Sequence, residues 1–525
     1  MFAVRARLGS TFHLLAGAGL LLAVAAMVAY DHRYHEFWRD EVHPIVLGAH
    51  VPLHRLLLAK KVEGYPPLFD LLTMPLVGLV SPEWRLLLTG GIGFGVLLAG
   101  TYACLLSISS RREASLVLTA LFAGTYAFGY EFGVVIRPYA LGCGLALFTN
   151  ALLRDALRTS RTRSVVLGTV TASLCALTSS HATTYVGGSL VAFGLVSLWR
   201  QRSIKFILPT FAVLPALALL AYEIMPFPGR SAELNVDQHL PHARFVPMAL
   251  QAIEGSFTPQ DWWLAATFGE PATVARIAFF RHWAPIGIGI GVLYSAALRA
   301  SSEFRAYRPV MVYDVVGLLI GWAALLEILV DHYWGSARHH QFLSLPVAVV
   351  LAGWAIQRGP EVPRILGWAP ALALPLMGAW FAYQWILFKR DIVLDMEQPF
   401  TDTKVAAAAL APDAHVVGES ITMQEALMLW KPGIVMRGAD CAGRHLGYTA
   451  FDSEWHTGVA VPPMIREECA AAPDRTFYSG WQWSLGPFAS CAKTVASAST
   501  HSEQTRPDEH MDVYKLDCAC VAHGK

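Results

Sequence analysis

The sequence predicts a polytopic all-α membrane protein that carries a small soluble α/β domain at its C-terminal end. Of the 525 residues, 54% are hydrophobic and only 15% are charged, whereas a soluble globular protein has about 25% charged residues. Long apolar runs recur from residue 14 to residue 388, and the composition becomes more polar after them. The net charge of +1 indicates no nucleic-acid partner. The composition excludes a disordered chain and argues against an ordinary cytosolic enzyme.

The first apolar run, residues 14–30, predicts a retained transmembrane helix rather than a removable signal. It is longer than a typical signal-peptide core, and no small-residue cleavage site separates it from Asp31. Arg5 and Arg7 precede it, which places the N-terminus in the cytoplasm. Further runs are apolar enough to cross a membrane and bring the total to about eleven spans. These runs are 84–107, 114–134, 138–153, 164–182, 184–199, 205–224, 283–298, 310–330, 341–357 and 365–388.

Charges in the connecting loops predict the orientation. The positive-inside rule places the short basic loops in the cytoplasm. These loops are 111–112, 154–163, 200–205, 299–308 and 358–364. The loops 31–83 and 225–282 and everything after residue 389 then lie outside. This arrangement requires that the short apolar segment 66–80, which contains Asp70, does not cross. A twelfth span there would put the tail inside and reverse most basic loops.

The predicted membrane domain covers residues 1–388, and the predicted soluble domain covers residues 389–525. In the soluble domain, short apolar runs alternate with a helical pattern, which is typical of a small α/β domain. The predicted elements are helices at 403–410 and 423–430 and strands at 415–418, 433–436, 476–478 and 512–516.

The cysteines divide between the two domains. Three lie in apolar runs and are expected to be buried packing residues. The other five are Cys441, Cys469, Cys491, Cys518 and Cys520. An oxidising outer compartment allows up to two disulfides among these five and leaves one thiol over. Free thiols and zinc are alternatives, but the spacing of Cys518 and Cys520 does not suit a zinc knuckle.

The first outer loop contains an acidic pair, Asp40 and Glu41. The run 42–61 that follows has apolar residues at helical spacing and ends in Lys60 and Lys61. Such a run is typical of a helix that lies in the membrane interface, which would hold the carboxylates near headgroup depth. The alternative is a solvated acidic surface without a function.

Two further segments on the same predicted side contain arginines. Arg137 lies between the third and fourth spans, and Arg338 lies in the loop 331–340, which is rich in histidine and aromatic residues. An arginine can hold a phosphate with two parallel hydrogen bonds. The alternatives are an arginine that snorkels to the headgroups and an interfacial loop with aromatic anchors.

Short motifs in these segments resemble those of one family, and they occur in order within residues 10–360. They are similar to W-x-D-E at 38–41, H/E-x-P-P-L at 63–68, R-x-Y-A-L at 137–141 and R-Y-L-L…P at 338–346. The family is the membrane-embedded C-type (GT-C) glycosyltransferases. Its nearest branches are the bacterial lipopolysaccharide-core sugar transferases, the aminoarabinose transferases and the protein mannosyltransferases. His339 stands where the family usually has Tyr, and the soluble tail carries no motif of the family.

The resemblance implies a GT-C-like fold and an inverting transferase in the bacterial inner membrane, with a polyprenyl-phosphate sugar as donor. The acceptor outside the cytoplasm is a glycolipid, a polysaccharide or a protein. Asp40 matches the family's catalytic base, and Glu41 would orient the acceptor or raise the pKa of Asp40 by like-charge repulsion. The residues expected to bind the lipid phosphate are Arg137, Tyr139, Lys60, Lys61 and Arg338.

No cofactor is predicted as required. His35, His43, Asp40 and Glu41 could converge on a divalent ion, but a monophosphate donor needs less charge neutralisation than a diphosphate.

Two alternatives belong to other functional classes. A transporter or flippase for a lipid-linked sugar would have ionisable residues near mid-membrane and repeated halves. We detect no repeat, and most charges lie at the ends of the predicted spans, with Glu223, Asp314 and Glu327 as the exceptions. A non-catalytic scaffold would not need Asp40.

Overall fold

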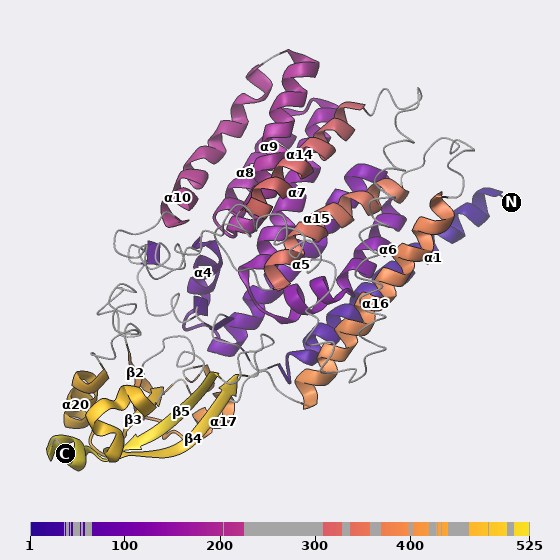
Figure 1. The fold of residues 1–525 in the computed structure, drawn as a ribbon. Helices are drawn as coiled ribbons and strands as arrows, with labels where there is room; N and C mark the ends of the chain where they lie inside the picture. Colours follow the sequence, from indigo (N-terminus) through magenta and orange to yellow (C-terminus); the bar gives the residue numbers. More distant parts are fainter. Residues whose placement is uncertain are drawn as a thin grey trace, which may run out of the picture.

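A computed structural model of the chain describes two parts, a helical bundle and a small sheet domain. The described residues are 2–35, 37, 41–42, 44–45, 53, 56–57, 66–202, 204–224, 308–327, 337–356, 369–397, 403–418, 427, 429–431, 433–438, 461–480, 482–500 and 509–523. The N-terminus and the sheet domain lie at opposite ends of the molecule (Figure 1).

Among the described residues, 6 helical segments are long and apolar enough to cross a membrane. Two of them are whole helices, α5 (Pro82–Ser109) and α7 (Pro138–Thr159). Three lie within single helices: Thr11–Asp31 in α1 (Phe2–Asp31), Ser180–Arg200 in α9 (Ser180–Gln201) and Pro309–Leu326 in α14 (Arg308–Glu327). The sixth, Ile204–Glu223, runs through η3 (Ile204–Phe206), η4 (Leu208–Val213) and α10 (Leu214–Ile224). Each coincides with a predicted run, so the polytopic all-α class is confirmed. The predicted span 283–298 and the whole of the loop 225–282 lie outside the described residues.

The predicted span at 114–134 is two helices rather than one. α6 (Arg112–Ala123) stops at Gly124, and the π-helix η2 (Tyr126–Val134) begins after Thr125. The Thr125 hydroxyl accepts a hydrogen bond from Phe128 N–H at 3.3 Å. Trp385 of α16 (Ala369–Glu397) lies against Gly124, where any Cβ would overlap its ring. The break therefore coincides with a contact that only glycine permits, against a helix far along the chain.

Three other predicted boundaries are wrong by several residues. α8 (Thr162–Ala176) ends before 182, because the Ser179 side chain accepts from Ala182 N–H at 3.3 Å and starts α9 there. α15 (Ala337–Ile356) already includes residues 338–340, which were expected in a loop, and α16 continues past residue 388 to Glu397. Hydropathy marks where a helix leaves the apolar layer, and the helix itself continues into polar sequence.

The segment 66–80 forms only α4 (Leu68–Thr73) and the short 3-10 helix η1 (Met74–Leu76). The 6 residues of α4 are far fewer than the roughly 20 that a membrane-crossing helix needs. Leu68 N–H donates to Leu177 O at 2.8 Å, at the end of α8. This structure agrees with the prediction that the segment does not cross.

Glycines set the closest helix contacts in the bundle. α5 and α7 meet at Gly100 and Gly144, and a Cβ on Gly144 would lie 2.6 Å from the backbone N of Leu97. In the same way, Gly188 of α9 lies against the backbone of α14 at Gly317. Small residues let helix backbones approach closely in membranes.

A buried polar network joins α7 to its neighbours near the C-terminal end of that helix. The fully buried Arg154 donates through Nε to Asp314 Oδ1 at 3.0 Å, and Trp354 Nε1 donates to Asp314 Oδ2 at 3.1 Å. Arg154 also donates to Asn150 Oδ1 and to Ser107 Oγ, both at 2.5 Å. The predicted basic loop 154–163 therefore begins inside α7, and Asp314 is paired with an arginine.

The tail contains a five-stranded mixed sheet with the strand order β2-β1-β3-β5-β4. Its strands are β1 (His415–Gly418), β2 (Val435–Gly438), β3 (Thr476–Gly480), β4 (Ala492–Thr500) and β5 (Glu509–Leu516). β1 pairs in parallel with β2 and β3, whereas β5 pairs antiparallel with β3 and β4. The sheet confirms the predicted α/β class. The sequence analysis missed β4, because its small residues have weak strand preferences.

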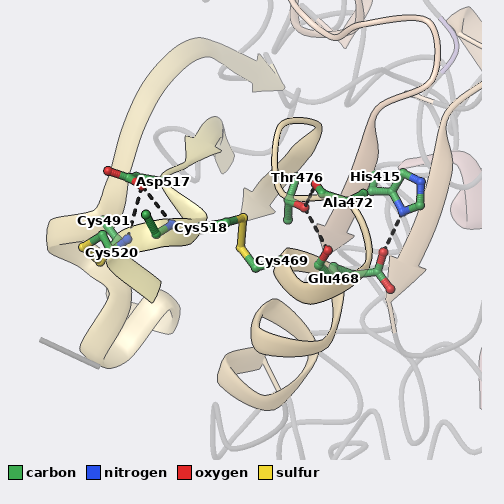
Figure 2. Close-up of a disulfide and its surroundings, with 10 residues drawn as sticks. His415, Glu468, Cys469, Ala472, Thr476, Cys491, Asp517, Cys518 and Cys520 are labelled. Atoms are coloured by element: carbon green, nitrogen blue, oxygen red, sulfur yellow. Dashed lines mark hydrogen bonds and ion pairs between the residues drawn. A yellow bond between two sulfur atoms is a disulfide. The ribbon is translucent and has the colours of Figure 1, made fainter. Parts of the chain in front are cut away.

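Two disulfides hold the last helix of this domain, α21 (Cys518–His523), to the rest (Figure 2). Cys469 of α20 (Val461–Ala471) bonds to Cys518, and Cys491 at the end of η10 (Gln482–Cys491) bonds to Cys520. The expectation of two disulfides is confirmed, and Cys441 lies outside the described residues. Beside them, Glu468 pairs with His415 Nδ1 at 2.7 Å and ties α20 to β1.

Candidate functional site

The first outer loop packs into the molecule rather than lying in water. Five of its described side chains, His35, Phe37, Glu41, Val42 and Ile45, are buried, whereas Arg33 and Leu53 are exposed. A solvated acidic surface is therefore excluded for Glu41, whose side chain is 0% exposed. Asp40 lies outside the described residues.

Glu41 links this loop to a distant turn. Its Oε1 accepts a hydrogen bond from Ile136 N–H at 2.6 Å, and its Oε2 lies 3.1 Å from His35 Nε2. Ile136 is 95 positions further along the chain. A buried carboxylate is stabilised when it accepts N–H groups in this way.

The sequence explains why the turn presents that N–H group. η2 ends where Val135 N–H donates to Tyr130 O at 2.9 Å, and Pro138 opens α7 at a position that suits proline. The residue before a proline is pushed toward an extended conformation, and Arg137 has φ −142° and ψ 165°. The Ile136 side chain packs on α5, where a Cβ on Gly90 would come within 2.8 Å of it.

Arg137 and Tyr139 act as one unit at the start of α7. The Arg137 guanidinium carbon lies 5.6 Å from the centre of the Tyr139 ring, and an Arg137 NH group donates to the Tyr139 hydroxyl at 3.3 Å. Both side chains are buried. The Tyr139 ring meets Phe342 of α15 and His181 of α9 edge to face, at 5.7 and 6.3 Å between ring centroids. The aromatic contacts from two further helices fix the orientation of the ring that supports Arg137.

The predicted site residues are thus partly brought together. Glu41 touches the residue next to Arg137, and Arg137 touches Tyr139. Lys60 and Lys61 lie outside the described residues, as Asp40 does. Arg338 lies in the first turn of α15, and only its backbone is described.

A buried carboxylate in η2 adds to this region. Glu131 accepts a hydrogen bond from the Tyr126 hydroxyl, and the Tyr130 ring lies 6.3 Å from the His35 ring. π-Helices are rare and often occur at functional sites. Neither Glu131 nor His181 was predicted as a site residue. Both are polar residues within apolar stretches of the sequence, and this pattern could have identified them as candidates.

Histidines surround Glu41. His32 lies 6.4 Å from His35 between ring centroids. Burial, together with repulsion from His35, lowers the pKa of His32 to about 4. Among the residues that the structure describes, no group of three or more His, Cys, Asp or Glu side chains is placed to hold a metal. Asp40 and His43 belong to the suggested metal set and lie outside those residues.

The sheet domain contacts the same loop. The Phe37 ring stacks on Trp430 at 5.9 Å between ring centroids, and Trp430 Nε1 donates to Thr403 Oγ1 at 3.2 Å. The Lys404 ammonium lies 5.0 Å from the centre of the Trp430 ring. The tail and the loop that carries the acidic pair therefore lie at the same end of the bundle.

No family model matches the sequence, and no curated protein does. Solved structures do match. ArnT from Cupriavidus metallidurans in the apo state has a TM-score of 0.51 at 13% identity, over 98% of this chain and 99% of that one. This chain has a GT-C fold. The same ArnT bound to undecaprenyl phosphate gives 0.51 at 14% identity, over 95% and 97% of the two chains. An Archaeoglobus fulgidus oligosaccharyltransferase overlaps more loosely, with 0.47 at 12% identity over 89% and 69%.

Proposed function

We propose that this GT-C protein transfers a sugar from a polyprenyl-phosphate donor to an acceptor on the outer side of the membrane. The contact of Glu41 with Ile136 carries the proposal, because it joins the acid-bearing loop to the turn before Arg137. An in-line displacement needs a base and a phosphate-binding cation on opposite sides of the sugar carbon. ArnT, which has a similar fold, was solved with undecaprenyl phosphate, and that supports a lipid-phosphate donor here.

In this proposal, Asp40 takes the proton from the acceptor hydroxyl as the oxygen attacks the anomeric carbon. The bond from that carbon to the phosphate oxygen breaks, and the lipid phosphate leaves with the electron pair. The configuration inverts because there is one displacement. Arg137 stabilises the charge that grows on the phosphate, and the N-terminus of α7 favours the same charge. Tyr139 holds Arg137, and Lys60, Lys61 and Arg338 are further candidates for contact with the phosphate.

The proposed orientation has the N-terminus in the cytoplasm and the tail outside the inner membrane of a bacterium. The opposite positions of the N-terminus and the sheet domain (Figure 1) and the two disulfides support it. The acceptor would be a cell-envelope glycolipid, a polysaccharide or a protein. The pairing of Asp314 with Arg154 weakens the transporter alternative, since a transport site needs an ionisable group that can change partners.

The test is transfer by the purified protein in lipid nanodiscs, with a panel of radiolabelled polyprenyl-phosphate sugars and an extract of envelope glycolipids as acceptors. We expect the label to move to an acceptor, and Asp40→Asn to reduce turnover by at least about a hundredfold, the usual contribution of a positioned base. Folded yield should stay unchanged, because Asn keeps the shape of Asp. Near-normal turnover in Asp40→Asn would move the base elsewhere. Movement of intact donor across a vesicle membrane without sugar transfer would favour the transporter.

A further inference from the structure

We infer that Glu41 is a positioning residue, whose carboxylate latches the loop that carries Asp40 to the turn that carries Arg137. This inference rests on the proposed function and assigns Glu41 a role other than proton transfer. The Glu41 latch consists of three groups, the Glu41 carboxylate, the Ile136 N–H and the His35 ring.

The geometry of Glu41 does not suit a proton acceptor for a substrate. A general base must come within hydrogen-bond reach of the hydroxyl that it deprotonates. The Glu41 side chain is 0% exposed, and each of its oxygens lies within hydrogen-bond distance of an N–H group or of the His35 ring. An acceptor hydroxyl would have to displace one of these groups.

The turn on the other side of the latch is held firmly. Ile136 is 1% exposed, and its side chain packs against α5 at Gly90, where there is no room for a Cβ. On one side of it, Val135 N–H closes η2. On the other side, Arg137 stacks on Tyr139. An attachment to Ile136 therefore fixes the loop to a rigid part of the bundle.

The latch bonds the chain neighbour of Asp40 to the chain neighbour of Arg137. Glu41 follows Asp40, and Ile136 precedes Arg137. Since consecutive Cα atoms are about 3.8 Å apart, a shift at either end of the latch would change the gap between the base and the phosphate-binding cation. A misplacement of about 1 Å can cost roughly a hundredfold in rate. The His35 ring, 3% exposed, holds the second carboxylate oxygen and keeps the carboxylate in this orientation.

The experiment compares Glu41→Gln with Glu41→Ala in the transfer assay, at equal amounts of folded protein. Gln retains an amide oxygen that can accept from Ile136 N–H, but it loses the charge, and charge-assisted hydrogen bonds are about twice as strong as neutral ones. We expect Gln to lower kcat by about tenfold or less. We expect Ala to lower kcat by about a hundredfold, with the donor KM within about threefold, because Arg137 remains.

The pH profile separates a latch from a base even if the Ala variant folds poorly. In Glu41→Gln, kcat/KM should still fall at low pH as it does in the wild type, since Asp40 still takes up a proton there. Glu468→Gln is the matched control, because it alters a second Glu–His pair among the described residues, the one that joins α20 to β1 in the sheet domain. It should leave kcat and KM unchanged.

Three results would overturn the latch. Glu41 would be a base if Glu41→Gln were as inactive as Asp40→Asn and its kcat/KM no longer fell at low pH. Glu41→Ala with full kcat would show that the contact is not needed. A rise in donor KM with unchanged kcat would make Glu41 a binding residue. In all three cases the wild type still transfers sugar, so the proposed function stands. An inactive wild type overturns that function, and the latch with it.

Discussion

Helix α7 has a buried arginine near each end, and the two differ in their surroundings. Near the C-terminal end, Arg154 donates to the carboxylate of Asp314 in α14, and Trp354 of α15 donates to the other oxygen of the same carboxylate. At the N-cap, Arg137 stacks on Tyr139. The helix dipole favours a cation at the C-terminus and an anion at the N-terminus. Arg154 lies before the last turn of α7, where the dipole has little effect. Arg137 lies at the N-cap and adds positive charge where the helix already favours a negative ligand.

The difference predicts a structural role for Arg154 and a role in turnover for Arg137. Arg154 brings α5, α7 and α14 together through the buried Asp314 and the half-buried Ser107. Arg137 follows Ile136, which bonds to Glu41 in the loop with the acidic pair. That loop contacts the sheet domain through Phe37 and Trp430. Removing Arg154 should therefore affect folding, and removing Arg137 should affect turnover.

The largest expected effect is that of Arg154→Ala on folding. The substitution leaves Asp314 as an uncompensated buried charge, which costs about 3–5 kcal/mol out of a total stability of about 5–15 kcal/mol. We expect little monodisperse protein by size-exclusion chromatography in detergent. The double variant Arg154→Met/Asp314→Leu removes both charges and should restore the folded yield with normal turnover. A folded but inactive Arg154→Ala protein would instead place Arg154 in the chemistry.

Arg137→Ala should leave the folded yield intact and reduce turnover by about a hundredfold, the usual effect of losing one donor to a developing negative charge. The donor KM should also rise, because the ground-state phosphate loses a contact. Arg137→Lys should recover activity only in part, since an ammonium cannot form two parallel hydrogen bonds. Kinetics in nanodiscs measure both effects. Loss of the folded protein in Arg137→Ala would contradict the contrast between the two ends of α7.

The sequence predicted the parts of the molecule that depend on local composition. Apolar runs located the spans, and the strands at 415–418 and 476–478 followed from short β-branched and aromatic runs. Hydropathy did not show the break at Gly124, because the sequence is apolar on both sides of it, and the contact of Gly124 with Trp385 depends on a distant helix. The same holds for Arg154, whose position near a basic loop gave no sign of Asp314.

The site was predictable in its residue types and less so in its contacts. Charged residues in an apolar protein identified Glu41 and Arg137 as candidates, and the motifs identified Tyr139. The partner of Glu41 is a backbone N–H group, which every residue except proline has, so no sequence pattern could single out Ile136. The edge-to-face contacts of Tyr139 with Phe342 and His181 likewise depend on how three helices pack.

The smallest expected effect is a loss of thermal stability in acid, which should arise from His32 at the Arg137 end of the bundle. Burial lowers the pKa of His32 from 6.5 to about 4. Between these values the unfolded chain takes up a proton that the folded chain does not, so stability should fall as the pH drops from about 6.5 to about 4. Below pH 4 both states are protonated and the loss ends. The charges that act on His32 are His35, which opposes protonation, and Glu41, which favours it. We expect His32→Gln to remove about 1–3 °C of the acid-induced decrease in melting temperature. Melting curves in detergent at several pH values would show this, and an equal decrease in the wild type and the variant would mean that His32 is not the group that titrates.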